Sequence, residues 1–176
     1  MFKFGTILAT TALLMTPAAL AQTGTNATAT FINADGQEVG TVTLTQTADG
    51  VQIAGEVNGI SPGEHAIHIH ETGDCDPTTA FESAGGHFEP GEHQHGLENP
   101  QGPHAGDIPN QMADANGIFR IEATTARVTL GEGETSLFDA DGSALVIHAG
   151  PDDNVTDPAG NSGDRVACAV IEAAAQ

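Results

Sequence analysis

The stretch Ile67-His68-Ile69-His70 guides the interpretation of this 176-residue sequence. Isoleucine is β-branched and favours strands, and here it alternates with histidine. Residues two apart in a strand share one face, so the two histidines project to one side and the two isoleucines to the other. Two neighbouring imidazoles on a rigid strand can both reach one small cation. An isolated pair is equally compatible with solvated side chains at a sheet edge.

Seven other short runs of strand-forming residues, most of them alternating, surround this strand. They span residues 27–32, 39–44, 51–57, 117–122, 127–130, 144–148 and 165–171. The turn pairs Asp35-Gly36, Asp49-Gly50 and Asn58-Gly59 separate or end the first three, which is typical of antiparallel hairpins. No segment has a sustained apolar period of 3.6 residues. About eight short strands in one domain predict an all-β fold, a β-sandwich or barrel.

Two stretches rich in glycine and proline interrupt the strands, at residues 71–115 and 149–164. A loop as long as the first is uncommon in a compact domain unless it has a function. We expect a disulfide and a metal to hold it in place.

Residues 1–21 have the organisation of a secretory signal peptide. Lys3 provides a basic start, an apolar run extends to Leu20, and Ala19-Leu20-Ala21 matches the small-residue cleavage pattern. The segment is too short and wrongly flanked for a membrane anchor. We therefore expect one mature domain of residues 22–176, located in the periplasm or outside the cell.

The mature chain would be strongly acidic and free of lysine. Arg120, Arg127 and Arg165 would face 24 acidic residues, which gives a net charge of −21. Such a surface repels nucleic acid and anionic membranes, so we expect neither as a partner. Disorder is another explanation of high net charge, and the recurring strand patterns argue against it.

Two cysteines, Cys75 and Cys168, are present. In an oxidising compartment an even pair is read as a disulfide. Closing a loop of this length is worth roughly 4 to 5 kcal/mol in the chain-entropy treatment. The alternative, two metal-binding thiolates, lacks the short spacing that such sites prefer.

Histidines also collect in the long loop. They are His87, His93, His95 and His104, with Asp107 close by and His148 far downstream. Imidazole suits zinc and copper, and one carboxylate among histidines is a common zinc set. A surface loop that is histidine-rich by chance is the alternative. A metal-scavenging tract is disfavoured because the histidines are dispersed rather than consecutive.

The sequence closely resembles the secreted bacterial copper–zinc superoxide dismutases. The resemblance covers nearly the whole mature chain and rests on motifs at residues 63–71, 83–90, 95–96, 102–107, 145–148 and 160–168. It implies an eight-stranded antiparallel Greek-key β-sandwich or barrel, immunoglobulin-like in architecture, with two long functional loops. It also implies conversion of superoxide to dioxygen and hydrogen peroxide by Cu(II)/Cu(I) cycling beside a structural zinc.

The resemblance further implies a role for individual residues. The copper ligands would be His68, His70, His87 and His148. The zinc ligands would be His87, His95, His104 and Asp107. His87 would bridge the metals and carry a proton, Asp152 would link a copper histidine to a zinc histidine, and Arg165 would attract and orient the substrate. Because no lysine is available near the channel, we expect weak steering that depends heavily on Arg165.

Two histidines stand outside this set. His65 shares the face of Ile67 and Ile69, and the resemblance implies a structural role. His93 has no counterpart in the family pattern, and we interpret it as a surface residue, with an accessory metal contact as the alternative. For the whole protein, the alternatives are a periplasmic copper-binding or storage protein without turnover and a purely structural secreted sandwich. A monomer and a homodimer are both compatible with the sequence.

Overall fold

The computed structural model describes residues 26–174, so the predicted signal peptide lies outside the described residues. The strands are β1 (Asn26–Asn33), β2 (Glu38–Thr47), β3 (Gly50–Asn58), β4 (Gly63–His65), β5 (Ile67–His70), β6 (Gln111–Ala113), β7 (Ile118–Thr125), β8 (Ala144–His148) and β9 (Arg165–Ala173). Two 3₁₀ helices, η1 (Pro77–Thr79) and η2 (Glu82–Ala84), lie in the first long loop. Each helix of this part of the chain has only three residues, far too few to cross a bilayer. The predicted all-β class is confirmed.

All nine strands belong to one antiparallel sheet in the order β4-β6-β7-β3-β2-β1-β9-β8-β5. Its two outer strands, β4 and β5, follow each other in the chain and are separated only by Ala66. The sheet therefore curls round on itself into a nearly closed barrel, and β4 with β5 counts as one of eight strands. The pairings β3–β7 and β1–β9 join strands distant in sequence, as Greek-key barrels do.

The barrel interior is filled by the apolar residues of the alternating patterns. In β1, Ala27, Ala29 and Phe31 are buried while the residues between them are exposed. Ile67 and Ile69 of β5 point into the same core and are fully buried. Phe31, Phe119, Leu44, Ile53, Leu145 and Ile147 are among its largest members.

The prediction of a strand at residues 127–130 was wrong. Thr129 forms only an isolated bridge with Ser136. The amide of Leu130 donates to the Gln46 side chain instead of to a neighbouring strand, with 2.8 Å between N and Oε1. The eighth place in the barrel is taken by β6, which lies within the stretch that we expected to be a loop.

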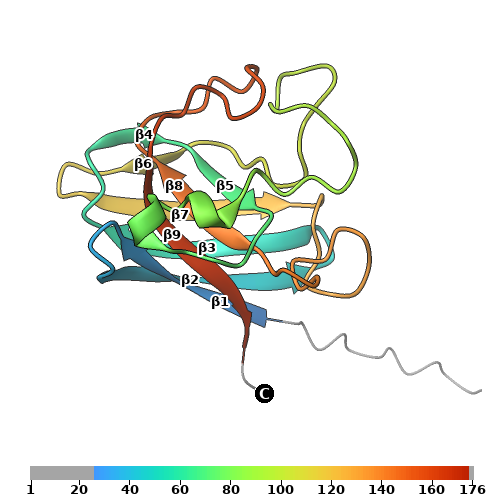
Figure 1. Ribbon diagram of the computed structural model, residues 1–176, viewed down its shortest axis with the longest axis horizontal. Helices are drawn as coiled ribbons and strands as arrows, with labels where there is room; N and C mark the ends of the chain where they lie inside the picture. Colours follow the sequence, from blue (N-terminus) through green and yellow to red (C-terminus); the bar gives the residue numbers. More distant parts are fainter. Residues whose placement is uncertain (1–25, 175–176) are drawn as a thin grey trace, which may run out of the picture.

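The predicted disulfide joins Cys75 to Cys168, with 5.6 Å between the Cα atoms. Cys168 lies on β9 and packs with Phe81 and Ala84 of the first loop in a second, smaller core. This part of the loop is thereby fastened beside β9. In Figure 1 the yellow-green part of the first loop and the red second loop lie side by side over one side of the barrel, where the Glu98 amide donates to the Asn154 carbonyl.

Candidate metal centre

The histidine strand β5 brings the first loop onto the barrel. On one side β5 pairs with β8, which ends at His148. On its other side, isolated bridges join His68 to Asp107 and His70 to His87. The backbone approaches closely here, since a Cβ on Gly106 would lie 2.2 Å from the Ile69 carbonyl oxygen. Only glycine fits at this position.

Six histidines and two aspartates meet where the loops cover β5 and β8. All are buried, with at most 8% of each residue exposed: His68, His70, His87, His95, His104, His148, Asp107 and Asp152. This burial rules out the alternative that these histidines are solvated side chains on a surface loop. Buried polar groups need partners, so the bonding of each ring nitrogen indicates what the site can hold.

One set of ligand atoms is held mainly by strands. This strand-side group consists of His68, His70, His87 and His148, and one ligand atom from each lies within 4.8 Å of the others. In every ring the other nitrogen faces an oxygen acceptor. The acceptors are Asp152 Oδ2 for His68 (2.7 Å), the Gly85 carbonyl for His70 (3.0 Å), Asp107 Oδ1 for His87 (3.0 Å) and the Gly163 carbonyl for His148 (3.1 Å).

These acceptors fix the tautomer of each ring, because the nitrogen facing an oxygen must carry the proton. The remaining nitrogens are buried and have no hydrogen-bond partner within residues 26–174: His68 Nδ1, His70 Nε2, His87 Nε2 and His148 Nε2. Four unshared lone pairs that converge in a buried site fit a cation that prefers imidazole, such as copper.

The second set is held by the first long loop. This loop-side group consists of His87, His95, His104 and Asp107. Asp107 Oδ1 lies 3.0 Å from Nδ1 of His87, 3.0 Å from Nδ1 of His95 and 3.5 Å from Nδ1 of His104. Ligands of a tetrahedral zinc are about 3.3 Å apart, because each bond is about 2.0 Å long. Asp107 Oδ1 therefore lies at about the spacing of zinc ligands from the other three atoms.

His68 also approaches the loop-side group. Its ligand atoms lie within 4.8 Å of those of His87, His95 and Asp107, in a set that does not include His104. The rings of His68 and His87 are the closest pair, with 4.0 Å between centroids. Because His68 also belongs to the strand-side group, His104, whose Nδ1 lies 3.5 Å from Asp107 Oδ1, could take the fourth position beside Asp107.

His87 belongs to both groups. Its Nδ1 faces Asp107 and lies 3.4 Å from Nδ1 of His104, while its Nε2 is one of the four unpartnered nitrogens. A single imidazole therefore separates the two sites and presents one nitrogen to each.

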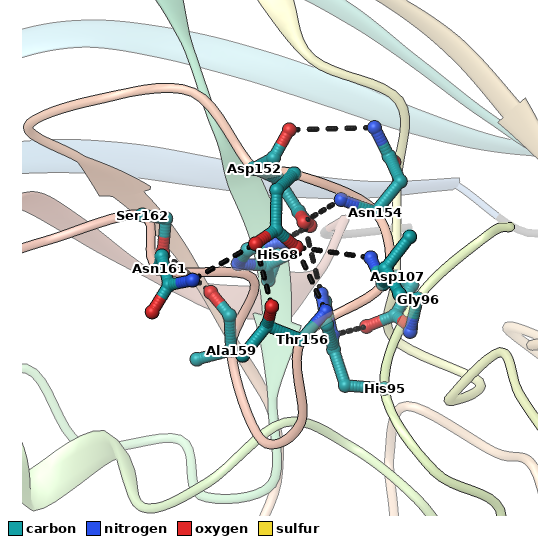
Figure 2. Close-up of polar contacts among 12 residues, drawn as sticks. His68, His95, Gly96, Asp107, Asp152, Asn154, Thr156, Ala159, Asn161 and Ser162 are labelled. Carbon is teal, nitrogen blue, oxygen red and sulfur yellow. Dashed lines mark hydrogen bonds and ion pairs between the residues drawn. The ribbon is translucent and has the colours of Figure 1, made fainter. Parts of the chain in front are cut away.

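Asp152 connects the two groups by hydrogen bonds to one histidine of each (Figure 2). Its Oδ2 accepts from His68 Nε2 at 2.7 Å and its Oδ1 accepts from His95 Nε2 at 3.0 Å. Asn110 fixes its backbone by a reciprocal pair of hydrogen bonds, each 2.9 Å long. Gly160 packs against the carboxylate so closely that a Cβ there would lie 1.8 Å from Asp152 Oδ1.

The electrostatics of the two groups differ. Burial lowers the pKa of His68 to about 3 and that of His148 to about 4, and it holds the pKa of His70 well below its usual value. Burial also acts to lower the pKa of His95, but hydrogen bonds to Asp107 and Asp152 outweigh it and raise this pKa to about 9. Both ring nitrogens of His95 face carboxylate oxygens, so without metal this ring is an imidazolium.

The two carboxyl groups are correspondingly anionic. Burial alone would raise the pKa of Asp107 and of Asp152, but hydrogen bonds from the surrounding histidines hold both well below the usual range.

A cavity of about 530 Å³ opens above the strand-side group. His70, His87, His148 and Arg165 are among its lining residues. The guanidinium of Arg165 donates from Nη1 to the Phe81 carbonyl and from Nη2 to the Gly85 carbonyl, both at 2.7 Å. The Gly85 carbonyl also accepts from His70, so one backbone oxygen aligns the arginine with a ligand ring.

The two remaining histidines lie outside both groups. His65 is buried, and its ring nitrogens face the His148 carbonyl and the Ser61 carbonyl, each at 2.8 Å, so it joins the end of β8 to the loop before β4. His93 is a surface residue whose side chain is 56% exposed and lies 3.0 Å from Glu89.

Two supporting residues were not predicted. Asn110 holds the backbone of Asp152, and the Arg127 guanidinium donates to the carbonyl of Asp107. Neither belongs to a sequence motif, because each acts on a residue that is close only in the folded chain.

Comparison with known proteins fits this geometry. Residues 38–171 match the family described as copper/zinc superoxide dismutase (SODC). The chain belongs to the copper/zinc superoxide dismutase family. Superoxide dismutase [Cu-Zn] 2 of Aquifex aeolicus is 51% identical over 145 residues, which cover 81% of this chain and 84% of that protein. Superoxide dismutase [Cu-Zn] of Caulobacter vibrioides is 45% identical over 150 residues, with 84% and 86% covered.

Among solved structures, a SOD-like protein from Bacillus subtilis superposes with a TM-score of 0.77 at 37% identity, covering 81% of this chain and 96% of that chain. Membership of the copper/zinc superoxide dismutase family makes this protein an oxidoreductase that uses copper and zinc and acts on superoxide. The disulfide and the bacterial relatives are consistent with a location outside the cytoplasm.

Proposed function

We propose that this protein dismutes superoxide at the strand-side group. Copper would be bound by His68, His70, His87 and His148, and zinc by His87, His95, His104 and Asp107. The observation that carries this proposal is the ring of His87, whose two nitrogens face the two groups. A protein that only stores copper has no need of a ring shared with a second metal site.

Bound copper supplies the change between Cu(II) and Cu(I) that takes an electron from one superoxide and returns it to another, which zinc cannot do. The residues contribute binding, orientation and protons. Arg165 is fixed by two carbonyls and presents its charge to a small anion in the cavity. Nε2 of His87 can hold one of the two protons that hydrogen peroxide requires, because the ring is kept in place through Nδ1.

Asp152 acts as a positioning residue for both groups. It holds the protons on Nε2 of His68 and of His95, and this directs Nδ1 of each ring toward its metal position. Arg165 should also dominate the rate, so Arg165→Ala should slow superoxide consumption at low ionic strength.

The test is superoxide consumption by protein loaded with copper and zinc, compared with the metal-free protein and with His87→Gln. Loss of this proton carrier should reduce turnover about a hundredfold or more in a variant that retains both metals by elemental analysis. His93→Gln is the matched control and should leave turnover unchanged. Undiminished turnover in His87→Gln would contradict the proposed role.

A copper-binding protein without turnover is the second candidate, because the relative from Bacillus subtilis is described as a SOD-like protein rather than as a superoxide dismutase. Tight copper binding together with no superoxide consumption would support it. Arg165 at the cavity and the complete loop-side group favour the dismutase, since storage requires neither.

We further propose that residues 1–21 are removed and that residues 22–176 function in the periplasm or outside the cell, without nucleic-acid or membrane partners. Support comes from the leader-like sequence, the disulfide and the acidic composition. N-terminal sequencing of the exported protein should begin at Gln22. Light scattering would distinguish a monomer from a homodimer.

A further inference from the structure

The rim of the cavity is acidic apart from one arginine. Glu82, Asp164 and Arg165 are the charged side chains on its wall besides the histidines. Within the described residues, Arg165 is the only lysine or arginine that lines it. Two carboxylates therefore share the cavity wall with Arg165, the side-chain cation that an incoming anion would meet.

Glu82 is held close to that cation. Its Oε2 lies 3.6 Å from Arg165 Nη2, and its side chain is 72% exposed while that of Arg165 is 14% exposed. Glu82 begins η2, and the residues flanking this helix, Phe81 and Gly85, supply the two carbonyls that bind Arg165. Since Phe81 is fully buried, the backbone of Glu82 is fixed beside the guanidinium.

Holding Arg165 in place does not require Glu82. Both terminal nitrogens of the guanidinium already donate to backbone carbonyls at 2.7 Å, and Glu82 is farther away than either. What the exposed carboxylate adds is a negative charge at the entrance. Asp164 lies on the same wall and forms no ion pair with Arg165 among residues 26–174.

We propose that Glu82 is a specificity-determining residue that weakens the capture of small monovalent anions, superoxide included, by partly neutralising Arg165. The inference rests on the proposed function for its substrate, although it concerns anions in general. Because the carboxylate is exposed, salt should screen its effect on an approaching anion beyond roughly 8 to 10 Å at physiological ionic strength. The consequence should therefore be largest in dilute buffer.

The test uses the copper- and zinc-loaded enzyme and its Glu82→Gln variant. At low ionic strength we expect Glu82→Gln to consume superoxide about two to three times faster, and the difference should vanish at high salt. Glu82→Asp keeps the charge and should resemble the unmodified enzyme. Glu172→Gln is the matched control, because it removes an exposed charge from β9 seven residues, or about 23 Å, beyond Arg165.

Azide provides a readout that is independent of turnover. Titration of the same proteins with azide, followed by the visible absorption of copper, should show about two- to threefold tighter binding in Glu82→Gln and no change in Glu172→Gln. Unchanged or weaker azide binding in Glu82→Gln would overturn the inference. Tighter azide binding without superoxide consumption by any variant would support the inference while refuting the proposed dismutase activity.

Discussion

The strand-side and loop-side groups share His87 but are held together in different ways. In the strand-side group, His68, His70 and His148 come from the paired strands β5 and β8, and each ring is braced through one nitrogen. In the loop-side group, every residue lies within residues 87–107, and the histidines surround one oxygen of Asp107.

The two groups differ in what holds their side chains in position when no metal is bound. The barrel fixes the strand-side rings, so their free lone pairs already converge. The loop-side group is held by protons between histidines and carboxylates, and zinc must displace them. We therefore expect the strand-side group to be preorganised and the loop-side group to depend on its charges.

The largest expected effect follows from removing the charge at the centre of the loop-side group. Asp107→Asn should abolish stoichiometric zinc binding and destabilise the metal-free protein by about 3 to 5 kcal/mol, because the His95 imidazolium loses a buried partner. Copper binding by the strand-side group should persist. Elemental analysis and urea denaturation measure these effects, and retention of zinc at full occupancy would refute the contrast between the groups.

A substitution at Gly160 should affect both groups, because Asp152 serves both. In Gly160→Ala the new Cβ would collide with Asp152 Oδ1, so we expect a loss of about 1 to 3 kcal/mol and weaker binding of both metals. Gly163→Ala is the matched control, since Gly163 also has a positive φ but its Cβ would meet only Ala149 at an ordinary 3.7 Å. Equal losses in both variants would show that backbone strain, rather than the collision, is responsible.

The stability of the metal-free protein should depend on pH with opposite signs for the two groups. The pKa values of His68 and His148 are lowered to about 3 and about 4, so the unfolded chain binds more protons below pH 6.5 and stability falls as the pH drops from 6.5 toward 3. The pKa of His95 is raised to about 9, so its contribution is complete below pH 6.5 and is lost as the pH rises through 9.

Urea denaturation from pH 4 to 10 should therefore give a maximum near neutrality. In His95→Gln the decline on the alkaline side should be smaller, while the decline on the acidic side should remain. An unchanged alkaline decline in this variant would rule out His95 as its source.

The smallest expected effect is a difference in proton release at pH 7. Zinc alone should release about one proton, from Nδ1 of the His95 imidazolium, and copper alone should release about none, because the strand-side rings are neutral. Both metals together should release about two, since the shared His87 then loses its last proton. Calorimetry in buffers of different ionisation enthalpy measures these numbers, and equal release by the two metals would contradict the assignment.

The strand framework could be predicted from alternation alone, because one face of each strand is buried, as in β1 and β5. The failure at residues 127–130 has a physical cause, since the Leu130 amide donates to the Gln46 side chain and therefore cannot pair with a neighbouring strand. The strands β4 and β6 are too short for a pattern to identify.

The candidate site was less accessible to sequence reasoning. The pair His68 and His70 followed from strand geometry, whereas the division of the other ligands between two metals depended on family resemblance. Asn110 could not be predicted at all, because it contacts Asp152 across 42 residues of sequence and has no local signature.

The bridges between the first loop and β5 have a consequence for solubility. β5 is the last strand in the sheet order, and its outer edge would present free backbone groups to any other chain. The loop occupies this edge, because the Ile69 amide donates to Gly106 and the Ile69 carbonyl accepts from Phe88. The segment that contains the loop-side group thus also shields an aggregation-prone edge, so conditions that loosen it would favour self-association as well as inactivity.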